Sequence, residues 1–212
     1  MTSQQSFEHA LTARERKLLA GLTTPFKIQA FLDSITYSTE NRYRCPLNVI
    51  RERVGHCFDG ALFAAMALRR LGHPPRVLDL LPNGRDDDHL LALYQVNGCW
   101  GAVAKSNFTV IRFREPVYRT VRELVMSYFD FYFNARGEKT LRGYAGPLSL
   151  RPFDRRHWLM DDAAIDLIAD RLDAIRPVVL LTPEMEARLE RVDKKLLEAG
   201  MLGVNPAGLF KL

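Results

Sequence analysis

The sequence predicts an α+β domain, in which a cysteine-bearing helix packs on an antiparallel sheet and other helices flank them. Three observations support this fold class. Helical periodicity dominates both ends of the 212-residue chain. A sharply bounded helix is expected over 58–71, and a strand over 76–81 follows it. Two further strands, 89–96 and 99–108, flank the turn dipeptide Asn97-Gly98, which favours a hairpin.

The first forty residues are predicted to be helical. A first helix spans about 7–22, where leucines recur among charged residues. A second helix opens at Thr24, a natural N-cap, with Pro25 at the N1 position that proline favours. Apolar residues then recur at helical spacing. Residues 36–46 are expected to form a loop.

The helix over 58–71 has the clearest boundaries in the chain. Asp59 lies in its first turn and Arg69 and Arg70 in its last, which matches the helix dipole at both ends. Gly72 then supplies the residue that commonly ends a helix, and prolines follow it.

The expected hairpin has a defined register. Asn97-Gly98 suits a two-residue type I′ turn. With that turn, His89 faces Ser106, and Ala104 lies on the same face of the second strand. Because this face carries small residues, we expect helix 58–71 to pack against it.

The chain after Pro116 is expected to be mainly helical. Thr120 and Glu123 form a capping box ahead of one helix. Two more helices are predicted over 161–175 and 183–199, the second with Gly200 behind it.

Composition excludes several classes of protein. The chain is 47% hydrophobic and 26% charged, as in soluble globular proteins. Its 30 basic residues are scattered among 25 acidic ones, so the charge distribution does not indicate a nucleic-acid partner. No stretch approaches the ~20 apolar residues of a membrane span, and the N-terminus lacks the pattern of a secretory signal. Three cysteines without CxxC spacing favour a reducing, cytoplasmic location.

Cys57 is the first candidate for chemistry, because it immediately precedes helix 58–71. Unpaired N–H groups at a helix N-terminus favour an anion, lower the pKa of a thiol and can stabilise an oxyanion. The alternative is that Cys57 is a small buried apolar residue, as free cysteines often are. We expect Cys57, and neither Cys45 nor Cys99, to be the strongly nucleophilic thiol.

His89 is the second candidate. It opens a strand, so its ring can lie at the edge of the sheet and reach the end of a helix. The alternative is a hydrogen-bonded surface histidine behind the acidic loop 86–88, whose charge would raise the pKa of His89. The same loop could bind a metal ion, but consecutive carboxylates diverge and no further ligand has a telling spacing. We therefore predict no metal and no organic cofactor.

These residues together carry a family resemblance. The stretch Gly55-His56-Cys57-Phe58-Asp59-Gly60-Ala61, continued by Leu71-Gly72-His73-Pro74-Pro75-Arg76-Val77, resembles the transglutaminase-like superfamily. There, a nucleophilic cysteine starts a helix that ends at Leu-Gly, and a Pro-Ala-Arg-Val-type strand follows. A histidine opening a strand and a Gly-x-Trp hairpin come next, matched by His89 and Gly98-Cys99-Trp100. The resemblance covers about residues 40–110 and implies a transglutaminase- or papain-like core.

The chain departs from the family at the group that orients the histidine. The family places an aspartate a few residues after the tryptophan, whereas Trp100 to Asn107 contains no acid. A Cys-His-Asn arrangement is chemically sound, so Asn107, turned inward by a bulge, is the predicted third catalytic residue. Ser106 is the alternative, and an acid such as Asp79 or Asp88 is a further one.

The resemblance implies a catalytic domain over 1–150, with a C-terminal helical extension over 151–212 packed on the same domain. It also implies acyl transfer or hydrolysis at the amide of a glutamine side chain or a peptide, through a thioester on Cys57. Two other classes stay open. One is a non-catalytic binding or scaffold module, and the other is a nucleic-acid-binding protein that uses the arginines and aromatics of 112–119.

Overall fold

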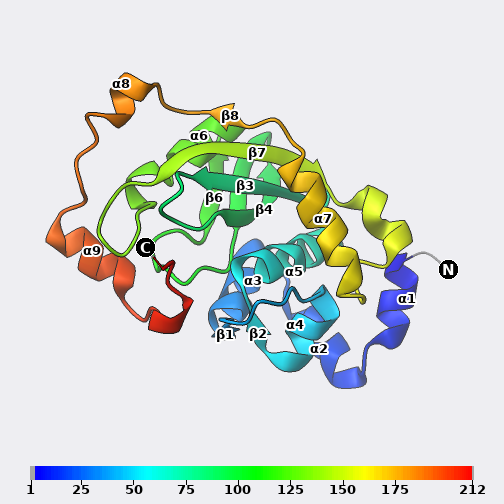
Figure 1. Ribbon diagram of the computed structural model, residues 1–212. Coiled ribbons are helices and arrows are strands. Elements are labelled where there is room, and N and C mark those ends of the chain that lie inside the picture. Colours follow the sequence, from blue (N-terminus) through cyan, green and yellow to red (C-terminus); the bar gives the residue numbers. More distant parts are fainter. Residues whose placement is uncertain (1–2, 212) are drawn as a thin grey trace.

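The computed structural model describes residues 3–211 (Figure 1). At its centre is an antiparallel six-stranded sheet in the order β6-β5-β4-β3-β7-β8. The strands are β3 (Arg76–Pro82), β4 (His89–Val96), β5 (Cys99–Val103), β6 (Arg114–Tyr118), β7 (Leu141–Ser149) and β8 (Val178–Val179). A separate parallel pair joins β1 (Thr36–Tyr37) to β2 (Val54–Gly55). Helices around an antiparallel sheet confirm the α+β class.

Helices cover both faces of this sheet. The α-helices of the described residues are α1 (Ser3–Ala10), α2 (Ala13–Gly21), α3 (Pro25–Asp33), α4 (Pro46–Glu52), α5 (Cys57–Arg70), α6 (Val121–Met126), α7 (Ala163–Asp173), α8 (Pro183–Glu186) and α9 (Lys194–Met201). In Figure 1, α3, α4 and α5 lie below the sheet, and α6 lies on its opposite side. No helix in residues 3–211 combines the length and the apolar character that crossing a membrane requires.

The N-terminal helices follow their capping residues. Thr24 accepts a hydrogen bond from the Lys27 N–H and opens α3, as predicted. The expected helix over 7–22 is instead α1 and α2, because Thr12 and Glu15 form a capping box that starts a new helix. The expected loop over 36–46 contains β1.

The hairpin has the predicted turn and register. Asn97 and Gly98 both have positive φ, 51° and 80°, as a type I′ turn requires. Ala92 pairs with Val103, in the predicted register. However, β5 ends at Val103, so the ladder does not extend to the expected pairing of His89 with Ser106.

The helix α5 packs on the face of the sheet opposite to the predicted one. Leu90, Ala92 and Val103 share an apolar cluster with α5. Ala104 instead belongs to a second cluster on the other face, where Tyr128 and other aromatic side chains fill the room that the small strand residues leave. Because alternate strand residues point to opposite faces, the prediction that α5 covers Ala104 is wrong.

The C-terminal third contains strands that the sequence did not indicate. The long strand β7 lies between β3 and β8, although it contains Gly143, Gly146 and Pro147, which usually weaken or end a strand. The helix α7 matches the segment predicted over 161–175. The expected helix over 183–199 is two short helices, α8 and α9.

Candidate active site

The start of α5 fixes the position of Cys57. The Asp59 carboxylate accepts hydrogen bonds from the His56 N–H at 3.0 Å and from the Arg44 N–H at 2.8 Å. His56 is the N-cap, and its ring Nδ1 accepts the Phe58 N–H at 3.5 Å. Cys57 is therefore the first residue of a doubly capped helix, as the sequence suggested within one position.

Two acceptor groups lie near the sulfur of Cys57. The Sγ atom is 3.5 Å from His56 Nδ1 and 3.9 Å from the main-chain oxygen of Asp88. Because Nδ1 accepts the Phe58 N–H, it carries no proton, and its single lone pair can take the thiol proton only by giving up that hydrogen bond. The resting thiol therefore has a base within reach.

The thiol of Cys57 is neutral at rest. Its side chain is only 4% exposed, and burial raises the pKa of Cys57 well above its ordinary value, with the negative charge of Asp88 adding to the effect. The sequence predicted the opposite direction from the helix dipole. Burial among carboxylates outweighs the dipole because the thiolate loses its hydration there.

His89 is also buried and neutral. Its Nε2–H donates to the main-chain oxygen of Ile111 at 2.8 Å, which leaves Nδ1 as the unprotonated nitrogen. Burial lowers the pKa of His89 to about 4. The acidic loop was expected to raise this pKa, but loss of hydration is the larger effect.

Cys57 and His89 line the same cavity, of about 40 Å³. Tyr37, from β1, and Ile111 are also in its wall. Within residues 3–211, no hydrogen bond directly joins the sulfur to the His89 ring. The two predicted residues, Cys57 of α5 and His89 of β4, thus line one small cavity.

Asn107 and Ser106 have other partners than His89. The Asn107 carboxamide accepts the Asn205 N–H at 2.9 Å, and donates to the main-chain oxygens of Asn205 and Gly208. Ser106 Oγ accepts the Phe108 N–H at 3.0 Å. The expected bond from Asn107 or Ser106 to His89 is absent because the chain leaves the sheet at Val103, and a main-chain oxygen takes that place.

Comparison with known proteins gives little further information. No family model matches the sequence, and no curated protein matches it. The solved structures that are similar to half of this chain include Legionella pneumophila LapG and its EGTA-treated form. Each is 14% identical, with a TM-score of 0.37, and the match covers 50% of this chain and 73% or 70% of LapG. The transglutaminase-like family assignment therefore stays a prediction, and the proposal below depends on the site geometry.

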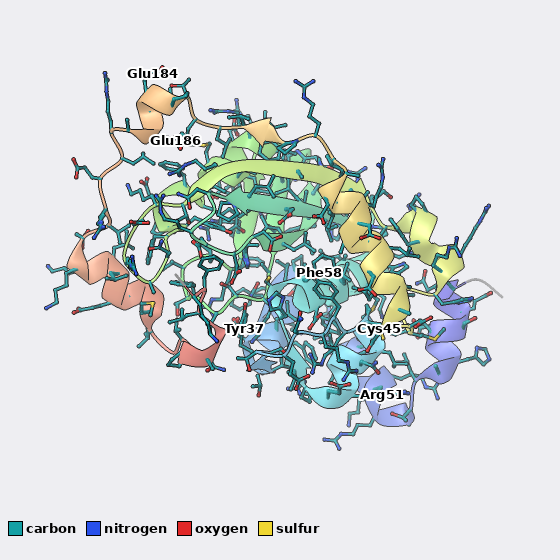
Figure 2. The ribbon with its side chains drawn as sticks, viewed as in Figure 1. Tyr37, Cys45, Arg51, Phe58, Glu184 and Glu186 are labelled. Atoms are coloured by element: carbon teal, nitrogen blue, oxygen red, sulfur yellow. The ribbon has the colours of Figure 1, made fainter. Side chains whose placement is uncertain are left out.

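Sequence reasoning missed two residues of this site. His56, next to Cys57, has its ring against the sulfur, and its position as N-cap was a usable signal. Tyr37 comes from a strand of two residues that the sequence did not indicate. Burial raises the pKa of Tyr37, so its hydroxyl keeps its proton beside Cys57. Figure 2 labels Tyr37 and Phe58, both in the part of the molecule that holds α3 to α5.

Two of the three arginines of 112–119 make contacts within the fold. The Arg114 guanidinium lies 3.9 Å over the Tyr128 ring and donates to the Ser127 oxygen at 3.1 Å. Arg112 pairs with Asp33 at 2.9 Å. In the described part of the chain, no group of three or more His, Cys, Asp or Glu side chains is arranged to hold a metal ion.

Proposed function

We propose that the protein is a cysteine-dependent enzyme that acts on the amide bonds of peptides or of glutamine side chains through a thioester on Cys57. The observation that carries this proposal is the position of Cys57, at the N-terminus of α5, with one imidazole 3.5 Å from its sulfur and a second in the same cavity. Nucleophile, base and oxyanion donors are the groups that acyl transfer needs.

The reaction starts from neutral groups. As the sulfur attacks the amide carbonyl, its proton passes to an imidazole, and the Cys57 N–H stabilises the oxyanion. The C–N bond then breaks, and the amine leaves with that proton. Water or another amine attacks the thioester and releases Cys57.

Two imidazoles are candidates for the base. His56 is nearest to the sulfur. His89 is held in one tautomer by Ile111, as a catalytic imidazole requires, but by a neutral oxygen that stabilises an imidazolium less than a carboxylate does. His56 is therefore included in the proposal beside the predicted His89.

A peptide library tests the proposal. The protein and its Cys57→Ala variant are each incubated with peptides from a digested proteome, and mass spectrometry then detects new termini and glutamine converted to glutamate. We expect products from the native protein and from Cys99→Ala, the matched control, but none from Cys57→Ala. Identical peptide sets for the native protein and Cys57→Ala would refute the proposed enzymatic activity.

A non-catalytic binding module is the second candidate function. Burial keeps both Cys57 and His89 neutral, and no carboxylate holds His89 among residues 3–211. Both features favour a protein that has the fold of such an enzyme but no catalytic activity. A library that stays unchanged under every condition would support this function.

A further inference from the structure

A second cavity opens on the other side of Cys57. It measures about 130 Å³ and lies between the start of α5, the strands β3 and β4, and the helix α7. Cys57 and Asp88 line both cavities, whereas His89 lines only the first. A group bound in the second cavity would therefore lie beside the sulfur.

A buried carboxylate lies in the wall of this cavity. Asp79 projects from β3 on the apolar face that Val77, Leu90 and α5 share, where it pairs across the ladder with Leu90. Its side chain is 5% exposed, and its buried Oδ1 has no hydrogen-bond partner in residues 3–211. An unpaired buried acceptor is costly for the fold, so it points to a donor that arrives with a ligand.

The charges around this cavity are of one sign. Asp88 and Asp173 line it and are both exposed to solvent. The lining contains no lysine and no arginine among the described residues, and only His56 adds a group able to carry positive charge. Negatively charged carboxylates around a narrow opening attract a cation.

We propose that this cavity receives a lysine-like ammonium side chain of the substrate, next to the carbonyl that Cys57 attacks. This inference rests on the proposed function and names its substrate class. Leu90 and Leu172 provide apolar walls for the methylene stem of a lysine. A single buried carboxylate suits a point-like ammonium better than the flat fork of a guanidinium.

The resting state of Asp79 is consistent with this role. Burial raises the pKa of Asp79 to about 8, and the negative charges of Asp88 and Asp173 add to the effect. Near pH 7, Asp79 is therefore largely protonated when no cation lies beside it. An ammonium beside it favours the carboxylate, so binding of the cation releases a proton.

Chloromethyl ketones with different side chains test the proposal. Three peptide reagents are used that differ only in the last residue, which is lysine, norleucine or arginine. The Cys57 sulfur displaces chloride and forms a C–S bond with the methylene carbon, and intact-mass spectrometry gives the rate. We expect the lysine reagent to react about tenfold faster than norleucine, the order expected of one charge-assisted hydrogen bond.

Two variants test whether Asp79 causes the difference between the lysine and norleucine rates. In Asp79→Asn, the ratio of the lysine rate to the norleucine rate should fall towards one. Asp170→Asn, which removes an exposed acid from the same helix as Asp173, should keep the native ratio. Equal rates for lysine and norleucine with Cys57 modified would overturn this inference and leave the proposed function standing. A faster arginine reagent would overturn the choice of ammonium.

A separate measurement decides the case in which no reagent modifies Cys57, which would count against the proposed function. The melting temperature is then compared in n-butylammonium chloride and in sodium chloride at equal ionic strength. Stabilisation by butylammonium that Asp79→Asn loses would support the cation cavity. Equal melting temperatures in the two salts would overturn it.

Discussion

Burial determines the ionisation of the single residues around Cys57. It raises the pKa of Cys57, lowers that of His89 to about 4 and raises that of Asp79 to about 8, in each case favouring the neutral form. The sequence shows which charges and helix ends are close along the chain, and these gave the wrong direction for Cys57 and His89. It does not show how much water each side chain loses, which is the larger effect here.

Asp79→Asn should make the protein more stable near pH 8, by at most a few kcal/mol, because asparagine stays neutral in the buried site without binding a proton. The native pKa of Asp79 is raised to about 8. Between about pH 4 and 8 the folded protein therefore binds a proton that the unfolded chain releases, so its stability falls as the pH rises. The stabilisation by Asn should grow across this window and be small near pH 4.

Urea unfolding at several pH values measures this difference, with Asp170→Asn as the control. A stabilisation that is the same at every pH would show that the ionisation of Asp79 is not its source. Destabilisation near pH 8 would show that Asp79 has a partner that stabilises its charge.

Among the elements, those with strong local signals were predicted well. The capped helices α3 and α5 and the Asn97-Gly98 turn depend on residues within a few positions of one another. The strand β7 was missed because its partner β3 is distant in sequence and because it contains residues that usually oppose strand formation. The strand β6 follows its partner β5 in the chain, but it contains Pro116, which is unfavourable inside a strand. Which face of the sheet α5 covers is also a long-range property.

Close packing of α5 on the chain after β5 depends on Gly60. A Cβ on Gly60 would lie 2.2 Å from the Cβ of Lys105. Lys105 is buried, and its Nζ donates to the main-chain oxygens of Leu32 and Ile35 near the end of α3, at 2.8 and 2.6 Å. Lys105 is thus held in place by its contact with α5 and by its hydrogen bonds to the end of α3.

Gly60→Ala should therefore destabilise the protein by about 1–3 kcal/mol through overpacking. This loss would appear even though alanine favours a helix by roughly 0.8–1.0 kcal/mol over glycine. Urea unfolding measures the change. Gly21→Ala in α2 is the matched control, because nothing lies within 4 Å of a Cβ at Gly21, and it should not destabilise. Similar effects of the two substitutions would contradict the packing argument.

At the scale of the whole molecule, the site lies at one end of the sheet, where side chains from both of its faces come together. The helix α5 covers one face, and His89, at the first position of β4, has its ring beside Tyr132 of the cluster on the other face. The sequence could indicate Cys57 and His89, because each opens an element. It could not indicate the partner of His89, because that depends on the path of the chain after Val103.

The path of the chain after Val103 also explains which segment covers the cavity that Cys57 shares with His89. Asn107 holds the segment 205–210 by three hydrogen bonds, and Gly208 and Phe210 of this segment line the cavity with Cys57. Figure 1 shows the red end of the chain returning from α9 towards the middle of the molecule. Access to Cys57 from this side therefore depends on a segment that the Asn107 side chain binds by three hydrogen bonds.

Asn107→Ala should make Cys57 more accessible. Each of the three lost hydrogen bonds contributes about 0.5–1.5 kcal/mol, so local opening of 205–210 should become at least about tenfold more frequent. Iodoacetamide modification of Cys57, followed by mass spectrometry, should accelerate to a similar extent, while Cys45, buried elsewhere, should keep its rate. Ser106→Ala is the control, because within residues 3–211 that side chain accepts the nearby Phe108 N–H and does not bond the segment 205–210. An unchanged rate at Cys57 in Asn107→Ala would mean that 205–210 does not limit access to the sulfur.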